Sequence, residues 1–214
     1  VCFSSRTPVE AQLAWLRQEQ PRHLIARAAV HEHLALAAYE HGAPAFDALL
    51  AIADQVTPDM RRRVEQSLGA PLHQNYGLNE FGMVAVRCPE AGRYHVHGEH
   101  CVFEIVDADG SPCVPGGQGR LLLTCLTNPA MPLLRYDTGD LARVAEGPCP
   151  CGRTLPAFAD LIGRHLHIAC LPAGVQAQER DLRELLETLP AAAWRGITQY
   201  QIRHARAGHG PLRV

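Results

Sequence analysis

The stretch "FDALLAIADQVTPDMRRRVEQSLGAPLHQNYG", residues 46–77, determines the fold that we expect for this chain. It opens with a short apolar run, "FDALLAIAD", which is typical of a buried strand. Thr57 can then cap a helix that Pro58 opens and Gly69 closes, and "PLHQNYG" follows as the next strand. This strand–helix–strand order predicts a parallel α/β sheet up to about Gly77.

Two more helices are expected before this stretch. The first, "VEAQLAWLRQEQ", follows a capping box that runs from Thr7 to Glu10, and it ends before Pro21. The second occupies residues 22–42 and ends at its terminal glycine. Both helices carry apolar residues with which they can pack on the predicted sheet.

The pattern changes from Phe81 onward to short alternating strands. These are "GMVAVRC", "HCVFEIVDADG", "GRLLLTCL" and "MPLLRYDTGD", with the turn dipeptides Asp-Gly and Gly-Gly between them. The second half should therefore be mainly antiparallel. A helix over residues 177–190 and a strand over residues 197–205 are expected to close the chain.

Composition narrows the class of protein. The chain has 214 residues, 47% of them hydrophobic, and a formal charge of -2, which suits one core or one core with a small appended piece. Its arginines are spread without a basic run, so we expect neither nucleic acid nor a membrane surface as a partner. No signal peptide or membrane-spanning apolar run is visible. Eight cysteines in such a chain indicate reduced thiols or metal ligands, and hence a cytoplasmic protein.

Two of these cysteines, Cys149 and Cys151, are only one residue apart in "EGPCPCGRTLP". A disulfide between them would close a very small and strained ring. Two thiolates this close can instead turn toward one metal ion, or remain free thiols. The residues alone leave both alternatives open.

Four motifs in a fixed order resemble a known family. "YGLNEFG", "NPAMPLLRYDTGD", "CPCGRTLP" and "LIGRHLHI" are similar to the sequence pattern of the adenylate-forming enzymes and, among them, of the phenylacetate–coenzyme A ligase group. The resemblance covers nearly all of the chain. It implies an α/β part of the adenylation domain over residues 1–80, an antiparallel β subdomain with a zinc knuckle over 81–163, and the start of a small α+β C-terminal domain over 164–214.

A nucleotide pocket is implied by the same resemblance. Tyr76 would offer an aromatic face to a purine, with the backbone of Gly77 close beside it. Glu80 would be a catalytic ligand for the magnesium that accompanies ATP. Asn79 stands where the family has a threonine and can still hydrogen-bond a phosphate.

Two later residues complete the implied pocket. Asp140 sits at a tight glycine turn in "RYDTGD", where its carboxylate can accept hydrogen bonds from both ribose hydroxyls. The resemblance gives it that role, and it gives Arg164 a second contact to ribose or phosphate.

The resemblance also implies how the cysteine pair is used. Members of the group with this Cys-x-Cys take two further ligands from an earlier Cys-x₆-His stretch, which is Cys88 and His95 in this chain. With Cys149 and Cys151 they make a Cys₃His set, the composition of a structural zinc site. His97 is a competing ligand because alternate residues of a strand share a face. The remaining cysteines are interpreted as ordinary core or surface residues: Cys2, Cys101, Cys113, Cys125 and Cys170.

The activity implied by the resemblance has two steps. An aryl carboxylic acid reacts with ATP to give an acyl-AMP, and coenzyme A then takes the acyl group as a thioester. The resemblance also implies a homodimer. It does not identify the acid.

This sequence departs from the family pattern in several places. The glycine-rich phosphate loop would lie upstream, and "FSSRTP" does not replace it because it lacks the glycines. Leu166 and His167 stand where the family has its hinge aspartates, and the sequence ends before the position of the catalytic lysine. We therefore expect no measurable acyl-adenylate formation by this chain alone.

Three functional alternatives follow. The chain is a piece of an aryl-acid ligase, or a short homologue that acts as a nucleotide-binding or regulatory module, or a zinc-stabilised domain without a nucleotide role. AMP binding separates the third from the other two.

Overall fold

A computed structural model describes residue 4, residues 6–165 and the two short segments 169–170 and 176–177. The strand expected over 197–205 lies outside these residues, as does the helix expected over 177–190 apart from its first residue. Leu166 and His167 also lie outside them.

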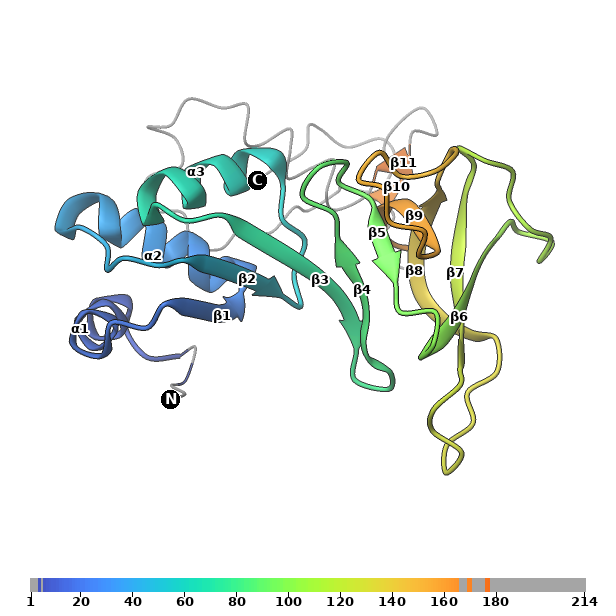
Figure 1. The fold of residues 1–214 in the computed structure, drawn as a ribbon, viewed down its shortest axis with the longest axis horizontal. Coiled ribbons are helices and arrows are strands. Elements are labelled where there is room, and N and C mark those ends of the chain that lie inside the picture. Colours follow the sequence, from blue (N-terminus) through green and yellow to red (C-terminus); the bar gives the residue numbers. More distant parts are fainter. Residues whose placement is uncertain (1–3, 5, 166–168, 171–175, 178–214) are drawn as a thin grey trace, which may run out of the picture.

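The N-terminal half contains two consecutive β-α-β units. Strand β1 (His23–Arg27), helix α2 (Ala28–His41), β2 (Ala48–Ile52), α3 (Pro58–Leu68) and β3 (Leu72–Leu78) follow one another. The three strands pair in parallel in the order β1-β2-β3. The predicted parallel α/β segment is confirmed, with one strand more than expected (Figure 1).

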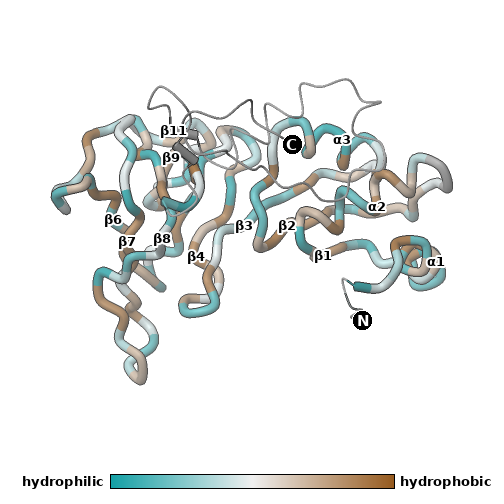
Figure 2. Tube along the Cα trace, turned by 180° about the vertical axis from the view of Figure 1, so that it is seen from behind, coloured by the Kyte–Doolittle hydropathy of each residue, from teal (hydrophilic) through white to brown (hydrophobic). Residues whose placement is uncertain are grey.

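Helix α3 forms as its local signals predict. Thr57 Oγ1 accepts a hydrogen bond from the Met60 amide at 3.2 Å, and Gly69 ends the helix with φ 68°. Met60, Val64 and Leu68 are buried at intervals of four residues, which places them on one face toward the sheet. The rest of α3 is hydrophilic, as its colour in Figure 2 shows.

Two predictions for the N-terminal region are wrong in part. Helix α1 (Val9–Glu19) forms, but Pro8 is its N-cap residue and no side chain caps it, so the capping box is absent. Residues 22–42 are not one helix, because β1 precedes α2. The pairing of β1 with β2 buries Leu24 under the helices, and this tertiary contact outweighs the helical propensity of "HLIAR".

The second half is antiparallel, as predicted. Its strands are β4 (Gly82–Arg87), β5 (Tyr94–Val96), β6 (Cys101–Val106), β7 (Gln118–Cys125), β8 (Tyr136–Val144) and β9 (Ala157–Arg164). Because β3 also pairs with β4, both halves share one nine-stranded sheet of order β1-β2-β3-β4-β5-β9-β8-β7-β6. Two short strands, β10 (Ala169–Cys170) and β11 (Gln176–Ala177), pair separately.

Two apolar cores lie along this sheet. The first joins the three helices to β1, β2 and the start of β3. The second is lined by β3 to β9 and is centred on Phe158, whose ring lies 5.1 Å from Tyr94, 5.8 Å from Phe103 and 6.1 Å from Tyr76. The antiparallel half is therefore curled, because strands that are not neighbours in the sheet contact the same ring. In the described part of the chain, no helix has the length and apolarity needed to cross a membrane.

Candidate nucleotide and metal sites

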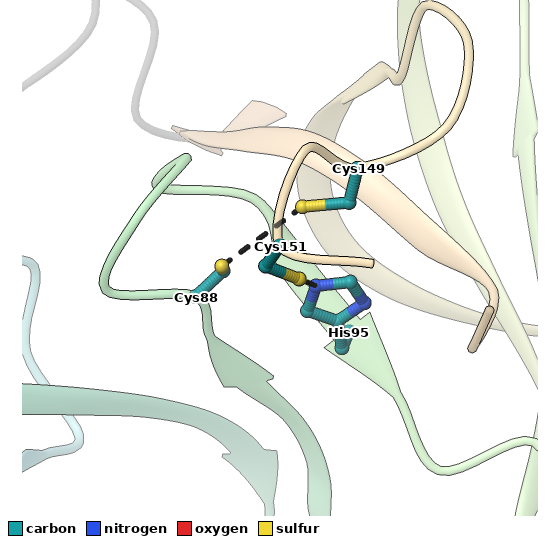
Figure 3. A group of neighbouring side chains, drawn as sticks. All are labelled: Cys88, His95, Cys149 and Cys151. Atoms are coloured by element: carbon teal, nitrogen blue, oxygen red, sulfur yellow. Dashed lines mark hydrogen bonds between the residues drawn. The ribbon is translucent and has the colours of Figure 1, made fainter. Parts of the chain in front are cut away.

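Three cysteines and one histidine converge between β4, β5 and β9. Cys88 directly follows β4, His95 lies in β5, and Cys149 and Cys151 lie in the segment that leads into β9. Figure 3 shows the four side chains pointing toward one another. Their ligand atoms all lie within 4.8 Å of one another, although Cys88 and Cys149 are 61 positions apart in sequence.

The spacing of these atoms suits a tetrahedral zinc ion. The sulfurs of Cys88 and Cys149 are 3.9 Å apart, and Cys151 Sγ is 3.4 Å from His95 Nε2. A tetrahedral ion with ordinary zinc–ligand bonds separates two sulfurs by about 3.8 Å and a sulfur from a nitrogen by about 3.5 Å. Small movements of these four side chains would bring all of their ligand atoms to bonding distance from one zinc ion.

Backbone amides support thiolates in this group. Burial raises the pKa of Cys88, but the backbone amides of the turn that follows it and the His95 side chain together lower this pKa below its ordinary value. The amide of Arg153 likewise lowers the pKa of Cys151. The Cys151 amide lowers the pKa of Cys149, but burial and the adjacent sulfurs outweigh it and leave this pKa raised. Two of the three sulfurs are thus predisposed to the form that binds a metal.

His95, and not His97, belongs to this group. His95 is buried, and its Nδ1 has no hydrogen-bond partner among the described residues. The His97 side chain instead lies 3.9 Å from the Glu99 carboxylate and is 36% exposed. Strand β5 ends at Val96, so the alternation that would have placed both histidines on one face stops before His97.

Three of the predicted nucleotide-binding residues also meet. The Tyr76 hydroxyl donates to Asp140 Oδ2 at 2.7 Å, and Arg164 Nε donates to Asp140 Oδ1 at 3.2 Å. Asp140 and Arg164 are directly paired across β8 and β9, whereas Tyr76 reaches Asp140 from β3 across the curled sheet. The Asp140 side chain is 13% exposed, so its carboxylate lies at the edge of the core.

Tyr76 does not present a free aromatic face in this arrangement. It is 8% exposed and packs edge-on against Phe158. Burial raises the pKa of its phenol well above the usual value, and the charge of Asp140 raises it further. A purine could stack on this ring only after the ring had left its packed position. Stacking on Tyr76 stays a prediction.

The other predicted residues lie at the end of β3 and in the β3–β4 turn. Asn79 and Glu80 are exposed, and the Tyr136 hydroxyl donates to Glu80 Oε1 at 3.1 Å. Gly77 lies at a bulge where a Cβ atom would come within 2.5 Å of the Gly82 carbonyl oxygen, so a larger residue would not fit. Because Glu80 is exposed, a cation can reach its carboxylate. Among the described residues, Tyr136 is the phenol that lies beside it.

Sequence reasoning missed Tyr136 and Thr138. Both lie in "RYDTGD", and the signal was their alternation with Asp140 along one strand. Thr138 Oγ1 is buried, donates to the Leu121 carbonyl and accepts from the Asp140 amide at 3.1 Å. It thereby fixes the backbone that presents the Asp140 carboxylate.

Comparison with known proteins accounts for this combination of fold and motifs. No protein-family model matches the chain. A phenylacetate-coenzyme A ligase of Thermus thermophilus is 34% identical over 160 residues, which cover 73% of this chain and 35% of the relative. The Escherichia coli enzyme of the same name is 36% identical over 116 residues, which cover 52% of this chain and 26% of that protein. The chain belongs to the phenylacetate–coenzyme A ligase group.

Solved structures of CoA ligases share the fold of this chain. A 2-hydroxyisobutyryl-CoA ligase in its postadenylation state superposes with a TM-score of 0.78 at 19% identity over 87% of this chain and 42% of that one. An anthranilate CoA ligase superposes with a TM-score of 0.68 at 15% identity, over 88% of this chain and 38% of that one. The chain spans about a third of the length of the Thermus relative, 35%.

Proposed function

We propose that this chain is part of an adenylate-forming acyl–coenzyme A ligase that acts on an aryl carboxylic acid of the phenylacetate type. The observation that carries the proposal is the carboxylate of Asp140, which Tyr76 and Arg164 hold at the edge of the core from two other strands. A fixed, negatively charged acceptor of this kind suits the two hydroxyls of a ribose. The relationship to phenylacetate-coenzyme A ligases supports the choice of reaction.

Each site residue then has a role in the first step, in which the acid displaces pyrophosphate from ATP. Asp140 accepts hydrogen bonds from the ribose hydroxyls, and the exposed guanidinium of Arg164 lies beside them for ribose or phosphate. Asn79 and Glu80 face the phosphates from the β3–β4 turn. Magnesium bound by Glu80 would neutralise phosphate charge, and Tyr136 orients this carboxylate by its hydrogen bond.

The cysteine–histidine group has a structural role in this proposal. Cys88, His95, Cys149 and Cys151 would hold one zinc ion without an open position, which suits a structural site better than a catalytic one. The ion would join the β4–β5 hairpin to the segment before β9. Since β9 carries Arg164, the metal would stabilise the strand that supplies one of the nucleotide contacts.

The domain organisation and the acyl acceptor are proposed from the same relationship to phenylacetate-coenzyme A ligases. We propose the three domains over residues 1–80, 81–163 and 164–214, with coenzyme A as the acyl acceptor in the second step. A cytoplasmic location fits the six free cysteines of the described residues. A homodimer stays a prediction of the resemblance.

Calorimetric titration with AMP tests the nucleotide site. In Asp140→Asn the amide oxygen still accepts from Tyr76, so the fold is kept while the charged acceptor for ribose is lost. Affinity should fall about 10- to 150-fold, which corresponds to about 1.5–3 kcal/mol for hydrogen bonds to a charged group.

Asp47→Asn is the matched control. Asp47 also pairs with one arginine, Arg22, but it lies at the amino end of β2, away from the proposed pocket. AMP binding should be unchanged in this variant. Equal affinity of the parent and Asp140→Asn, or the absence of AMP binding to the parent, would contradict the proposal.

A further inference from the structure

Two cysteines outside the metal group lie directly opposite each other in the sheet. Cys101 opens β6, Cys125 closes β7, and the antiparallel register pairs them. The Leu126 amide donates to the His100 carbonyl at 3.0 Å, so these two residues, which are next to the cysteines in each strand, form a hydrogen-bonded pair. The amides of Cys101 and Cys125 donate elsewhere, to His97 and Leu133. Cys101 and Cys125 thus form a non-hydrogen-bonded pair.

This type of pair brings two side chains close enough for a disulfide. Opposite Cα atoms in non-hydrogen-bonded pairs are about 4.5 Å apart, and disulfides form at Cα separations of about 4.4–6.8 Å. Both side chains point to the same face, where they contact the second core. A disulfide could therefore form without a change of register. Its geometry would lie at the short end of the range, which favours a strained and readily reduced bond.

The two sulfurs differ in exposure and in acidity. Cys101 is 1% exposed, whereas Cys125 is only partly buried. Backbone amides of Thr127 and Asn128 lower the pKa of Cys125, with Thr127 as the larger cause. Burial, together with the smaller effects of the adjacent Cys125 and of Glu99, raises the pKa of Cys101 to about 11. The accessible sulfur is thus the better nucleophile, and the buried one is a protected thiol beside it.

We propose that Cys101 and Cys125 are a reversible oxidation site that hydrogen peroxide converts into a cross-strand disulfide. The Cys125 thiolate attacks one peroxide oxygen, the O–O bond breaks, and hydroxide leaves, so that Cys125 becomes a sulfenic acid. The Cys101 sulfur then attacks the Cys125 sulfur. The S–O bond breaks, and hydroxide leaves with the Cys101 proton as water. Two thiols lose two electrons, and the peroxide is reduced.

The other described cysteines are placed differently. Cys88, Cys149 and Cys151 form the metal group described above, in which a bound ion would hold their sulfurs. Cys113 follows β6, and its thiol donates to the Gln118 carbonyl at the start of β7, at the opposite end of this strand pair from Cys101. Cys113 is partly exposed and belongs neither to the metal group nor to the Cys101–Cys125 pair. Its oxidation therefore serves as an internal control, because it reports how readily peroxide reacts with an accessible thiol outside the pair.

Peptide mapping tests the proposal on the folded, zinc-supplemented protein. After peroxide treatment, free thiols are blocked by alkylation, and the chain is cut with trypsin. The 20 basic residues are all arginine, so trypsin yields peptides 94–120 and 121–135. We expect these two peptides to be joined, with Cys113 alkylated and a mass about 2 Da below the summed masses of the two peptides that carry this single alkyl group. Dithiothreitol should separate them.

A second cut identifies the partner of Cys125, because peptide 94–120 contains both Cys101 and Cys113. Cleavage after Glu104 separates these two cysteines, and the link should stay with Cys101. Cys113→Ser should give the same yield of linked peptides, and Cys125→Ser should give none.

Three results would overturn the proposal. The first is a link from Cys125 to Cys113 or to a cysteine of the metal group. The second is an equal yield of the Cys101–Cys125 link from the urea-unfolded chain. The third is that Cys101 and Cys125 both remain free thiols at peroxide doses that oxidise Cys113. Since the parent protein alone can give each result, the test does not depend on whether a variant folds.

Discussion

Replacing both Cys149 and Cys151 by serine should remove zinc from the protein and lower its thermal stability. The change takes away two of the four ligands while Cys88 and His95 remain. In the parent the four ligand atoms already lie within 4.8 Å of one another, so little of the binding energy is spent on rearranging the chain. At a free zinc concentration about 1,000-fold above Kd, binding to the folded state alone stabilises it by about 4 kcal/mol.

This stabilisation translates into a measurable change of melting temperature. For a chain of 214 residues, about 4 kcal/mol corresponds to a shift in Tm of about 8–16 °C. The assay is differential scanning calorimetry at buffered free zinc, together with metal analysis of the dialysed protein. One zinc per parent chain and almost none in the double variant are expected.

The control for this experiment is Cys113→Ser, which removes a partly buried thiol outside the metal group. It should keep both the zinc and most of the melting temperature. A parent protein that binds no zinc, or a double variant that melts at the same temperature as the parent in the presence of zinc, would refute the zinc site.

Three further predictions concern stability. Asp140→Ala should cost about 1–3 kcal/mol in urea unfolding, because the buried Tyr76 hydroxyl loses its acceptor, and an unchanged midpoint would contradict this hydrogen bond. Thr57→Ala should cost about 1 kcal/mol in the same assay, because the α3 cap is lost, and a loss near zero would argue against the cap. Burial lowers the pKa of His31 below 6.5, so the unfolded chain gains a proton that the folded chain resists. Stability should therefore be complete above about pH 6.5 and fall below it. His31→Gln should flatten this dependence and His33→Gln should not.

Local signals were sufficient for several parts of the fold. Thr57, Pro58 and Gly69 determine where α3 begins and ends, because caps act on the nearest backbone groups alone. The alternation of apolar residues predicted most of the antiparallel strands. The order and spacing of Cys88, His95, Cys149 and Cys151, read through the family resemblance, predicted a ligand set whose atoms the fold brings together.

Only the tertiary structure decided the remaining features. "HLIAR" becomes β1 because β2 lies beside it, and Tyr76 turns inward because Phe158 and Asp140 lie across the curled sheet. The sequence determined which residues were available for strands, caps and ligands. Which strands pair, in which register and with which side chains facing, depends on contacts between segments far apart in the chain, and no local pattern encodes them. For that reason the pairing of Cys101 with Cys125 became visible only in the folded sheet.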